Sequence, residues 1–122
     1  MGNKPSEKIG PVAEAILAVE NAPLALVVAL PDGRVQLANR ALREMLGYGA
    51  GDLAGRDVWD FAGDVCAARQ RWREVLEAGE TAERLFEVRR QDGIMVQVRA
   101  ASIVVPDDDG APRFVITRLA AV

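Results

Sequence analysis

The stretch from Asp32 to Gly47 constrains the fold most, because turn, strand and helix signals follow one another without a gap. Asp32-Gly33 predicts a tight turn, since glycine adopts a positive φ without a Cβ clash. Alternation of polar and apolar residues over 34–37 predicts a short strand. Asn39 is a typical N-cap, whose side-chain oxygen accepts from free amides of the first helical turn. The following apolar residues have helical spacing, and Gly47 is typical of a left-handed helix end.

The rest of the chain carries the same kinds of signal. Asp64 is a natural N-cap, and apolar residues at helical spacing continue from it to Ala78, just before Gly79. Two further turns are indicated by Asp-Gly at 92–93 and by the acidic run ending in Gly110. The predicted strands around these turns cover residues 24–30, 85–91, 94–105 and 113–119.

Three short motifs occur in a characteristic order: D-G-x5-N over 32–39, L-G-Y over 46–48 and D-L-x-G-R over 52–56. Together with the later turns and strands, they resemble a PAS domain over roughly residues 23–119. The resemblance implies an α+β protein with a single PAS fold. This fold has a five-stranded antiparallel sheet with helices on one face and an N-terminal flanking helix. Residues 1–22 are expected to form a flexible start and the apolar flanking helix, and residues 23–122 the PAS domain.

The N-terminal segment is apolar on almost every side of its predicted helix. Residues 1–10 are polar and expected to be flexible, Pro11 suits a first helical turn, and residues 12–20 contain only two charges. A helix this apolar is not expected to expose most of its surface to water. Packing of Ile16 and Val19 on the sheet would leave a remainder, for which we expect a homodimer contact through Val12, Ile16 and Val19. The alternative is a helix that only covers its own sheet, whose strand 24–30 is apolar at every position.

Composition limits the class of protein. A chain of 122 residues fits one domain, and none of its apolar runs approaches the ~20 residues that span a bilayer. Its lone cysteine, Cys66, cannot form an internal disulfide. We therefore expect a cytoplasmic protein without membrane insertion. The net charge of −3 and dispersed arginines argue against nucleic-acid binding.

The resemblance also implies a cavity between sheet and helices. Its candidate lining is large and apolar: Val28, Leu37, Leu42, Leu46, Trp59, Phe61, Trp72, Val75, Leu76, Val96, Val98 and Ile116. A ligand there is expected to be mainly apolar or aromatic, with one or two polar contacts. The alternative is that these side chains form an ordinary close-packed core.

The residue types present limit which cofactors are expected. The chain has no histidine, the usual haem ligand of haem-binding PAS domains, so haem is not expected. Photosensory PAS domains carry a reactive cysteine shortly after the x-L-x-G-R segment, where this chain has Asp57-Val58-Trp59. A covalent flavin photocycle is therefore not expected, whereas noncovalent flavin stays open. Cap and loop positions account for Asp57, Asp60 and Asp64, so neither a metal site nor an enzyme is indicated.

The expected function is that of a regulatory sensor module. We expect the input domain of a bacterial-type signalling protein, such as a histidine kinase, cyclase, phosphatase or transcription regulator. It would bind a small apolar or aromatic ligand, dimerise, or do both. The alternative is a ligand-free protein-interaction and dimerisation module with a filled core.

Overall fold

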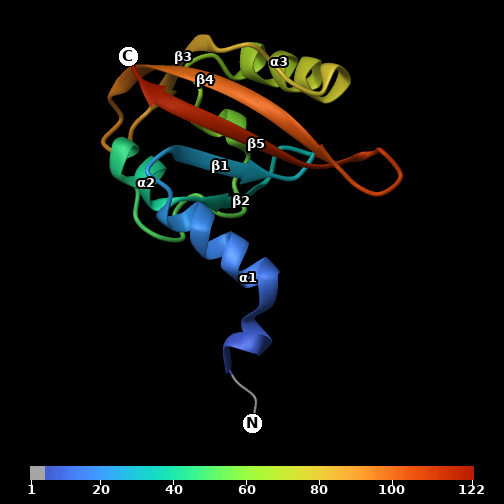
Figure 1. Cartoon of the computed structure of the whole chain (residues 1–122). Helices are drawn as coiled ribbons and strands as arrows, with labels where there is room; N and C mark the ends of the chain where they lie inside the picture. Colours follow the sequence, from blue (N-terminus) through green and yellow to red (C-terminus); the bar gives the residue numbers. More distant parts are fainter. Residues whose placement is uncertain (1–4) are drawn as a thin grey trace.

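The computed structural model describes residues 5–122 and contains one five-stranded antiparallel sheet, with strand order β2-β1-β5-β4-β3. The predicted α+β class with an N-terminal flanking helix is confirmed (Figure 1). In chain order the elements are α1 (Pro5–Asn21), β1 (Ala25–Ala29), β2 (Val35–Ala38), α2 (Arg40–Leu46), the short 3₁₀ helix η1 (Val58–Phe61), α3 (Val65–Ala78), β3 (Arg84–Arg89), β4 (Met95–Pro106) and β5 (Pro112–Ala121).

The helix ends follow from the local sequence. Asn39 caps α2 by accepting a hydrogen bond from the amide of Leu42 at 3.1 Å, and Gly47 ends the helix at φ +81°. Asp64 caps α3 by accepting from the amide of Ala67 at 3.0 Å, and Gly79 ends it in the left-handed region. Each glycine supplies a φ that side chains disfavour, so these boundaries were predictable without tertiary contacts.

Strand pairing gives the sheet two distinct faces. Ala29 of β1 pairs with Val115 of β5, and both side chains are almost fully buried. They lie on the face that α2 and α3 cover, which we call the inner face. One residue earlier, Val28 pairs with Leu37 and Ile116. Because side chains alternate across a strand, these three lie on the opposite, outer face.

The first helix departs from its predicted start. α1 begins at Pro5, so Pro11 lies inside the helix and not in its first turn. The predicted flexible segment 1–10 is therefore helical from residue 5, and its first four residues lie outside the described part of the chain. In the described chain no helix is both long and apolar enough to cross a membrane.

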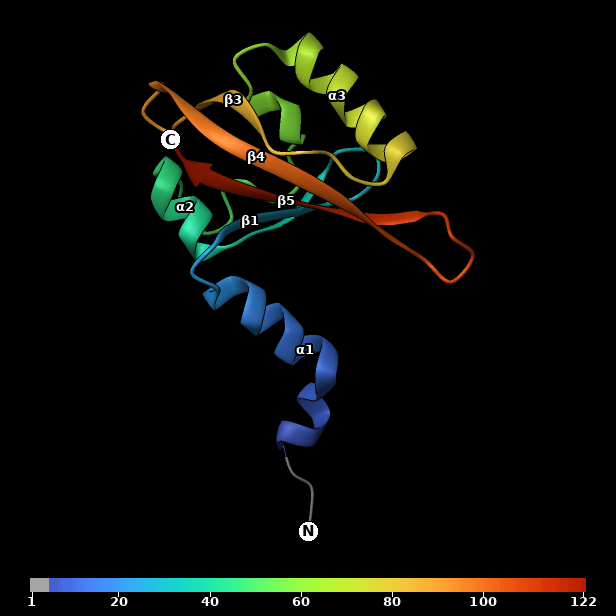
Figure 2. The ribbon, with the colours of Figure 1, turned by 45° about the horizontal axis from the view of Figure 1, so that its top comes forward.

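The direction of α1 is not the predicted one either. Figures 1 and 2 show α1 extending away from the sheet. Ile16 remains 52% exposed, so the prediction that it packs on the sheet is wrong. So is the alternative in which α1 covers its own sheet. β1 lies between β2 and β5 in the sheet, and α1 contacts the domain chiefly near α2.

Candidate functional site

A cavity of about 150 Å³ lies between the inner face of the sheet and the helices α2, η1 and α3. The lining is mainly apolar and comes from both the helices and the sheet. Among the predicted lining residues, the structure places at the cavity Leu42, Leu46, Trp59, Phe61, Trp72, Val75 and Val98.

The Asp32-Gly33 turn positions the aromatic wall of this cavity. The ring of Trp59 lies against Gly33, where any Cβ would collide with it. Trp72 donates a hydrogen bond from Nε1 to the carbonyl of Pro31 at 2.7 Å. The two indoles meet edge to face, with ring centroids 6.3 Å apart. A turn predicted only from its backbone signal therefore also holds two side chains of the cavity wall.

Three predicted lining residues are misplaced. Val28, Leu37 and Ile116 lie on the outer face, and Ile116 borders a separate shallow hollow of about 260 Å³. The error has a physical cause. β1 is apolar at every position and gives no phase for Val28, since a shift of one residue exchanges the faces. Leu37 and Ile116 pair with Val28, and an irregularity in the β1–β2 pairing puts Leu37 on the opposite face from Val35.

Two further predicted residues do not line the cavity. Leu76 packs against the buried cluster around Trp72, and Val96 packs against the cluster around Val98. Their places are taken by residues that the sequence prediction missed. The apolar ones are Val27, Val35, Leu53, Val58, Ala62, Ala68, Phe86, Val88, Ala100 and Leu119. Strand pairing and the placement of loops and helices bring them to the cavity.

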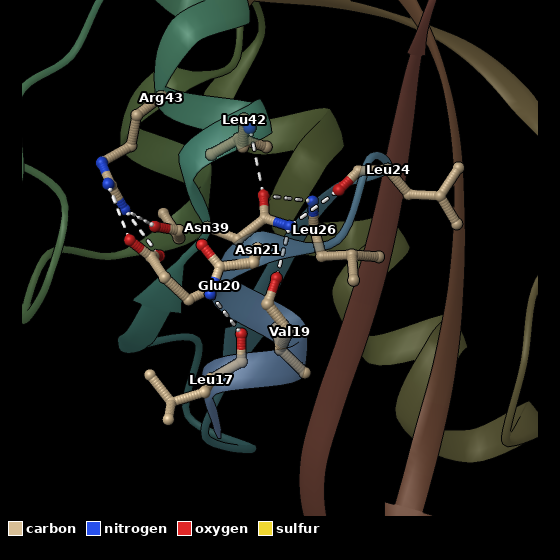
Figure 3. A network of polar contacts seen from close by, with 10 residues as sticks. Leu17, Val19, Glu20, Asn21, Leu24, Leu26, Asn39, Leu42 and Arg43 are labelled. Atoms are coloured by element: carbon tan, nitrogen blue, oxygen red, sulfur yellow. Dashed lines mark hydrogen bonds and ion pairs between the residues drawn. The ribbon is translucent and has the colours of Figure 1, made fainter. Parts of the chain in front are cut away.

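Asn39 does more than cap α2. Its side chain is completely buried and uses its full hydrogen-bonding capacity, as Figure 3 shows. Oδ1 accepts from the amides of Leu26, at 3.0 Å, and Leu42. Nδ2 donates to the carbonyls of Val19 at 2.8 Å and Leu24 at 2.7 Å. One side chain thus ties the end of α1 to β1 and α2.

An ion pair reinforces this connection. Arg43 of α2 binds both carboxylate oxygens of Glu20 at 3.0 Å and donates to the carbonyl of Ala38 at 2.7 Å. Bidentate pairing of this kind is directional as well as attractive. The hydrogen bond from Arg43 lowers the pKa of Glu20 from its ordinary value of 4.5, and the same bond raises the pKa of Arg43. We call Glu20, Asn39 and Arg43 the α1 anchor.

The cavity is small for a flavin. Its volume of about 150 Å³ is close to that of an engineered apolar cavity that binds benzene, whereas a flavin has three fused rings. Cys66, the only cysteine of the chain, is exposed at the start of α3 and is not a lining residue. The thiol that a covalent flavin adduct requires is therefore absent from the cavity wall.

Solved structures share this architecture. The PAS domain of an HTR-like protein from Haloarcula marismortui is 17% identical, with a TM-score of 0.78 and 96% of each chain covered. A PAS domain from a two-component sensor histidine kinase is 20% identical, with a TM-score of 0.75, over 94% of this chain and 97% of that one. An RNA-binding light-oxygen-voltage receptor is 26% identical, with a TM-score of 0.76. This chain is covered completely but spans only 36% of the receptor.

Comparison of the sequence with family models also points to a PAS domain over most of the chain. No curated protein matches it, but a family model described as a PAS domain matches residues 23–118. This range contains β1 to β4, most of β5, both capped helices and every cavity-lining residue except Leu119. The chain belongs to the PAS domain family.

Proposed function

We propose that the protein is a sensor module in which the occupancy of the central cavity is transmitted to α1. One observation carries the proposal: α2 takes part in both sites. Leu42 and Leu46 line the cavity, while Arg43 of the same helix and its cap Asn39 hold α1. A helix of two turns cannot shift at one site without disturbing the other.

The proposed ligand is small and mainly apolar or aromatic. Drug-sized ligand pockets begin at about 300 Å³, so the cavity of about 150 Å³ suits a molecule near the size of a single ring. The module would serve as the input domain of a signalling protein such as a histidine kinase, cyclase, phosphatase or transcription regulator. The role is regulatory and non-catalytic, and it involves no nucleic acid, in keeping with a net charge of −3.

Titration with ethylbenzene, followed by amide chemical shifts, tests this function. We expect shifts around the cavity that continue through α2 into Val19 and Glu20. Ala100→Leu should fill the cavity and abolish them, since Ala100 is a buried lining residue. Its neighbour Ala101 is on the outer face, so Ala101→Leu is the matched control. Failure to bind, or binding that leaves α1 unchanged, would contradict the sensor function.

Homodimerisation through α1 is a second candidate function, and it can accompany the first. Val12 is 74% exposed and Ile16 52% exposed, four residues apart on one side of a helix that projects into solvent (Figure 2). Val19 continues this stripe and is half-buried at its base. Exposed apolar stripes of this kind are typical of interaction surfaces. A second copy of the chain, which carries the same stripe, satisfies the symmetry of a two-fold interface.

Sedimentation equilibrium tests the dimer. We expect a concentration-dependent dimer that Ile16→Glu weakens by at least tenfold, because the substitution places a charge in an apolar contact. Ala18→Glu adds the same charge on the opposite side of α1 and should leave association unchanged. A protein that remains monomeric at high micromolar concentration would rule out this candidate.

A further inference from the structure

Three hydroxyl groups break the apolar lining of the cavity on one side. Thr81, Ser102 and Thr117 all line it, on the segment before β3, on β4 and on β5. Ser102 and Thr117 are opposite each other in the sheet, and their hydroxyl oxygens are 2.7 Å apart. The Thr81 hydroxyl accepts from the backbone amide of Ser102 at 3.2 Å. We call these three residues the hydroxyl cluster.

Not all O–H donors of the hydroxyl cluster are used in hydrogen bonds within the protein. In the Ser102–Thr117 pair one hydroxyl donates to the other, so one O–H proton remains. Thr81 uses its oxygen as an acceptor for Ser102, and its own O–H has no acceptor among the described residues. Two O–H donors thus remain at a wall that is otherwise apolar. Water can satisfy them in the empty cavity, and a ligand oxygen can replace that water.

The charged residues at the rim of the cavity do not favour either an anionic or a cationic ligand. The charged lining residues are Arg71 and Glu74 of α3 and Arg84 and Glu87 of β3, two of each sign. The guanidinium of Arg71 also stacks on Phe86, 4.5 Å from the ring centroid. The other polar side chains of the lining are the three neutral hydroxyls, which cannot balance a buried charge.

We infer that the cavity takes a neutral molecule with one ring, or an aliphatic body of that size, bearing a hydrogen-bond acceptor. The acceptor, a carbonyl or ether oxygen, lies against the hydroxyl cluster. The apolar body lies against Trp59 and Trp72. The inference rests on the proposed ligand binding and specifies its chemistry. The small volume of the cavity excludes fused ring systems. The equal number of positive and negative side chains at its rim disfavours ions. The two free O–H donors favour a ligand with a hydrogen-bond acceptor.

Four probes test these three properties on the full chain. Acetophenone has one ring and a carbonyl, ethylbenzene lacks the oxygen, benzoate is charged, and 2-acetylnaphthalene has two rings. Binding is followed by fluorescence of the two tryptophans and by chemical shifts of Leu42 and Val98 methyl groups. We expect acetophenone to bind more tightly than benzoate and 2-acetylnaphthalene.

Variants then isolate the acceptor contact. The double variant Ser102→Ala/Thr117→Val removes the bonded pair while preserving its shape. It should lower the preference for acetophenone over ethylbenzene by about two- to tenfold. Adding Thr81→Val should remove the remaining preference. Thr117→Ser keeps all three hydroxyls and should retain it. Circular dichroism confirms that each variant is folded.

The possible failures are distinguishable. If ethylbenzene binds and the preference for acetophenone is the same in the double variant, the acceptor contact is wrong while ligand binding stands. Tighter binding of benzoate would overturn the neutral ligand, and tighter binding of 2-acetylnaphthalene the single ring. If no probe binds the wild-type protein, the sensor proposal itself fails, and this inference fails with it.

Discussion

At the scale of single residues, Asn39 is a polar residue whose side chain is fully buried. It joins three segments that are separated along the chain: the end of α1, the start of β1 and the first turn of α2. Asparagine suits this position because it offers one oxygen acceptor and two N–H donors on a short side chain. Serine or aspartate would also cap α2, but neither supplies two donors for the carbonyls of Val19 and Leu24.

Substitution of Asn39 tests this double role. Asn39→Ala leaves buried donors and acceptors without partners and should lower the free energy of unfolding by about 3 kcal/mol. Asn39→Ser restores the helix cap and should recover about 1 kcal/mol. It should not restore the bonds to Val19 and Leu24. Urea unfolding measures the first effect and amide exchange in α1 the second. Equal stability of the alanine and serine variants would contradict the cap contribution.

Gly33 combines a positive φ with a close contact. Its φ is +94°, and a Cβ there would meet the ring of Trp59. Gly33→Ala should therefore cost about 1–2 kcal/mol for the left-handed backbone and more for moving the indole. Gly110→Ala is the matched control, because Gly110 has φ +86° and open space around its Cβ position. Urea unfolding should show a greater loss at Gly33, with altered tryptophan fluorescence. Equal losses would mean that Trp59 moves without cost.

At the scale of elements, α2 takes part in both the cavity and the attachment of α1, and the position of α1 depends on α2. α2 contributes the cavity residues Leu42 and Leu46 and, through Asn39 and Arg43, the attachment of α1. α1 itself exposes Val12, Ile16 and Leu17. Its orientation therefore rests on the anchor and not on burial of its own apolar surface. An element held in this way responds to a small change at its base.

Acid should loosen the anchor. The pKa of Glu20 is lowered in the folded protein, mainly by its hydrogen bond from Arg43, so the anchor contributes fully above the ordinary value of 4.5. As the pH falls below 4.5 through the lowered pKa, the carboxylate is protonated and that contribution is lost. The amide shifts of Val19 and Glu20 should change in this window.

Two variants make this prediction specific. Glu20→Gln should remove the pH-dependent change in the α1 amides, since the titrating partner of Arg43 is gone. Glu14→Gln removes a carboxylate on the exposed part of α1 and should leave the change intact. A transition that persists in Glu20→Gln would assign it to another group.

At the scale of the whole molecule, the PAS domain and α1 are separable. The two buried clusters draw their residues from 25–119, and the described side chains of α1, from residue 11 onward, contribute none. The buried interior is thus complete without the helix, which leaves α1 available to a second copy of the chain or to a neighbouring segment.

Truncation tests this separation. A chain beginning at Ala22 retains the Leu24 carbonyl for Asn39 and loses that of Val19. It should unfold cooperatively, with a stability loss of about 1 kcal/mol and a nearly unchanged dependence on urea. Loss of cooperative unfolding would show that α1 belongs to the core. Full-length protein in the same buffer is the reference.

The sequence by itself determined where the turns and the helix ends of this protein lie. Its turns, its two helix caps and the succession of strands along the chain follow from patterns within a few residues, and together they indicate the PAS family. Gly47 and Gly79 could be read in this way because backbone strain is local.

Only the tertiary structure decided which face each strand residue occupies and where α1 points. The unbroken apolar strand β1 has two equivalent faces until its partners are chosen, so Val28 was assigned to the wrong one. Leu37 and Ile116 lie on the outer face because they pair with Val28, and a register irregularity in the β1–β2 pairing separates Leu37 from Val35. The second role of Asn39 and the contact of Trp59 with Gly33 join residues about 13 to 26 positions apart. Such contacts leave no periodic trace in a sequence, because they arise only when separate elements meet.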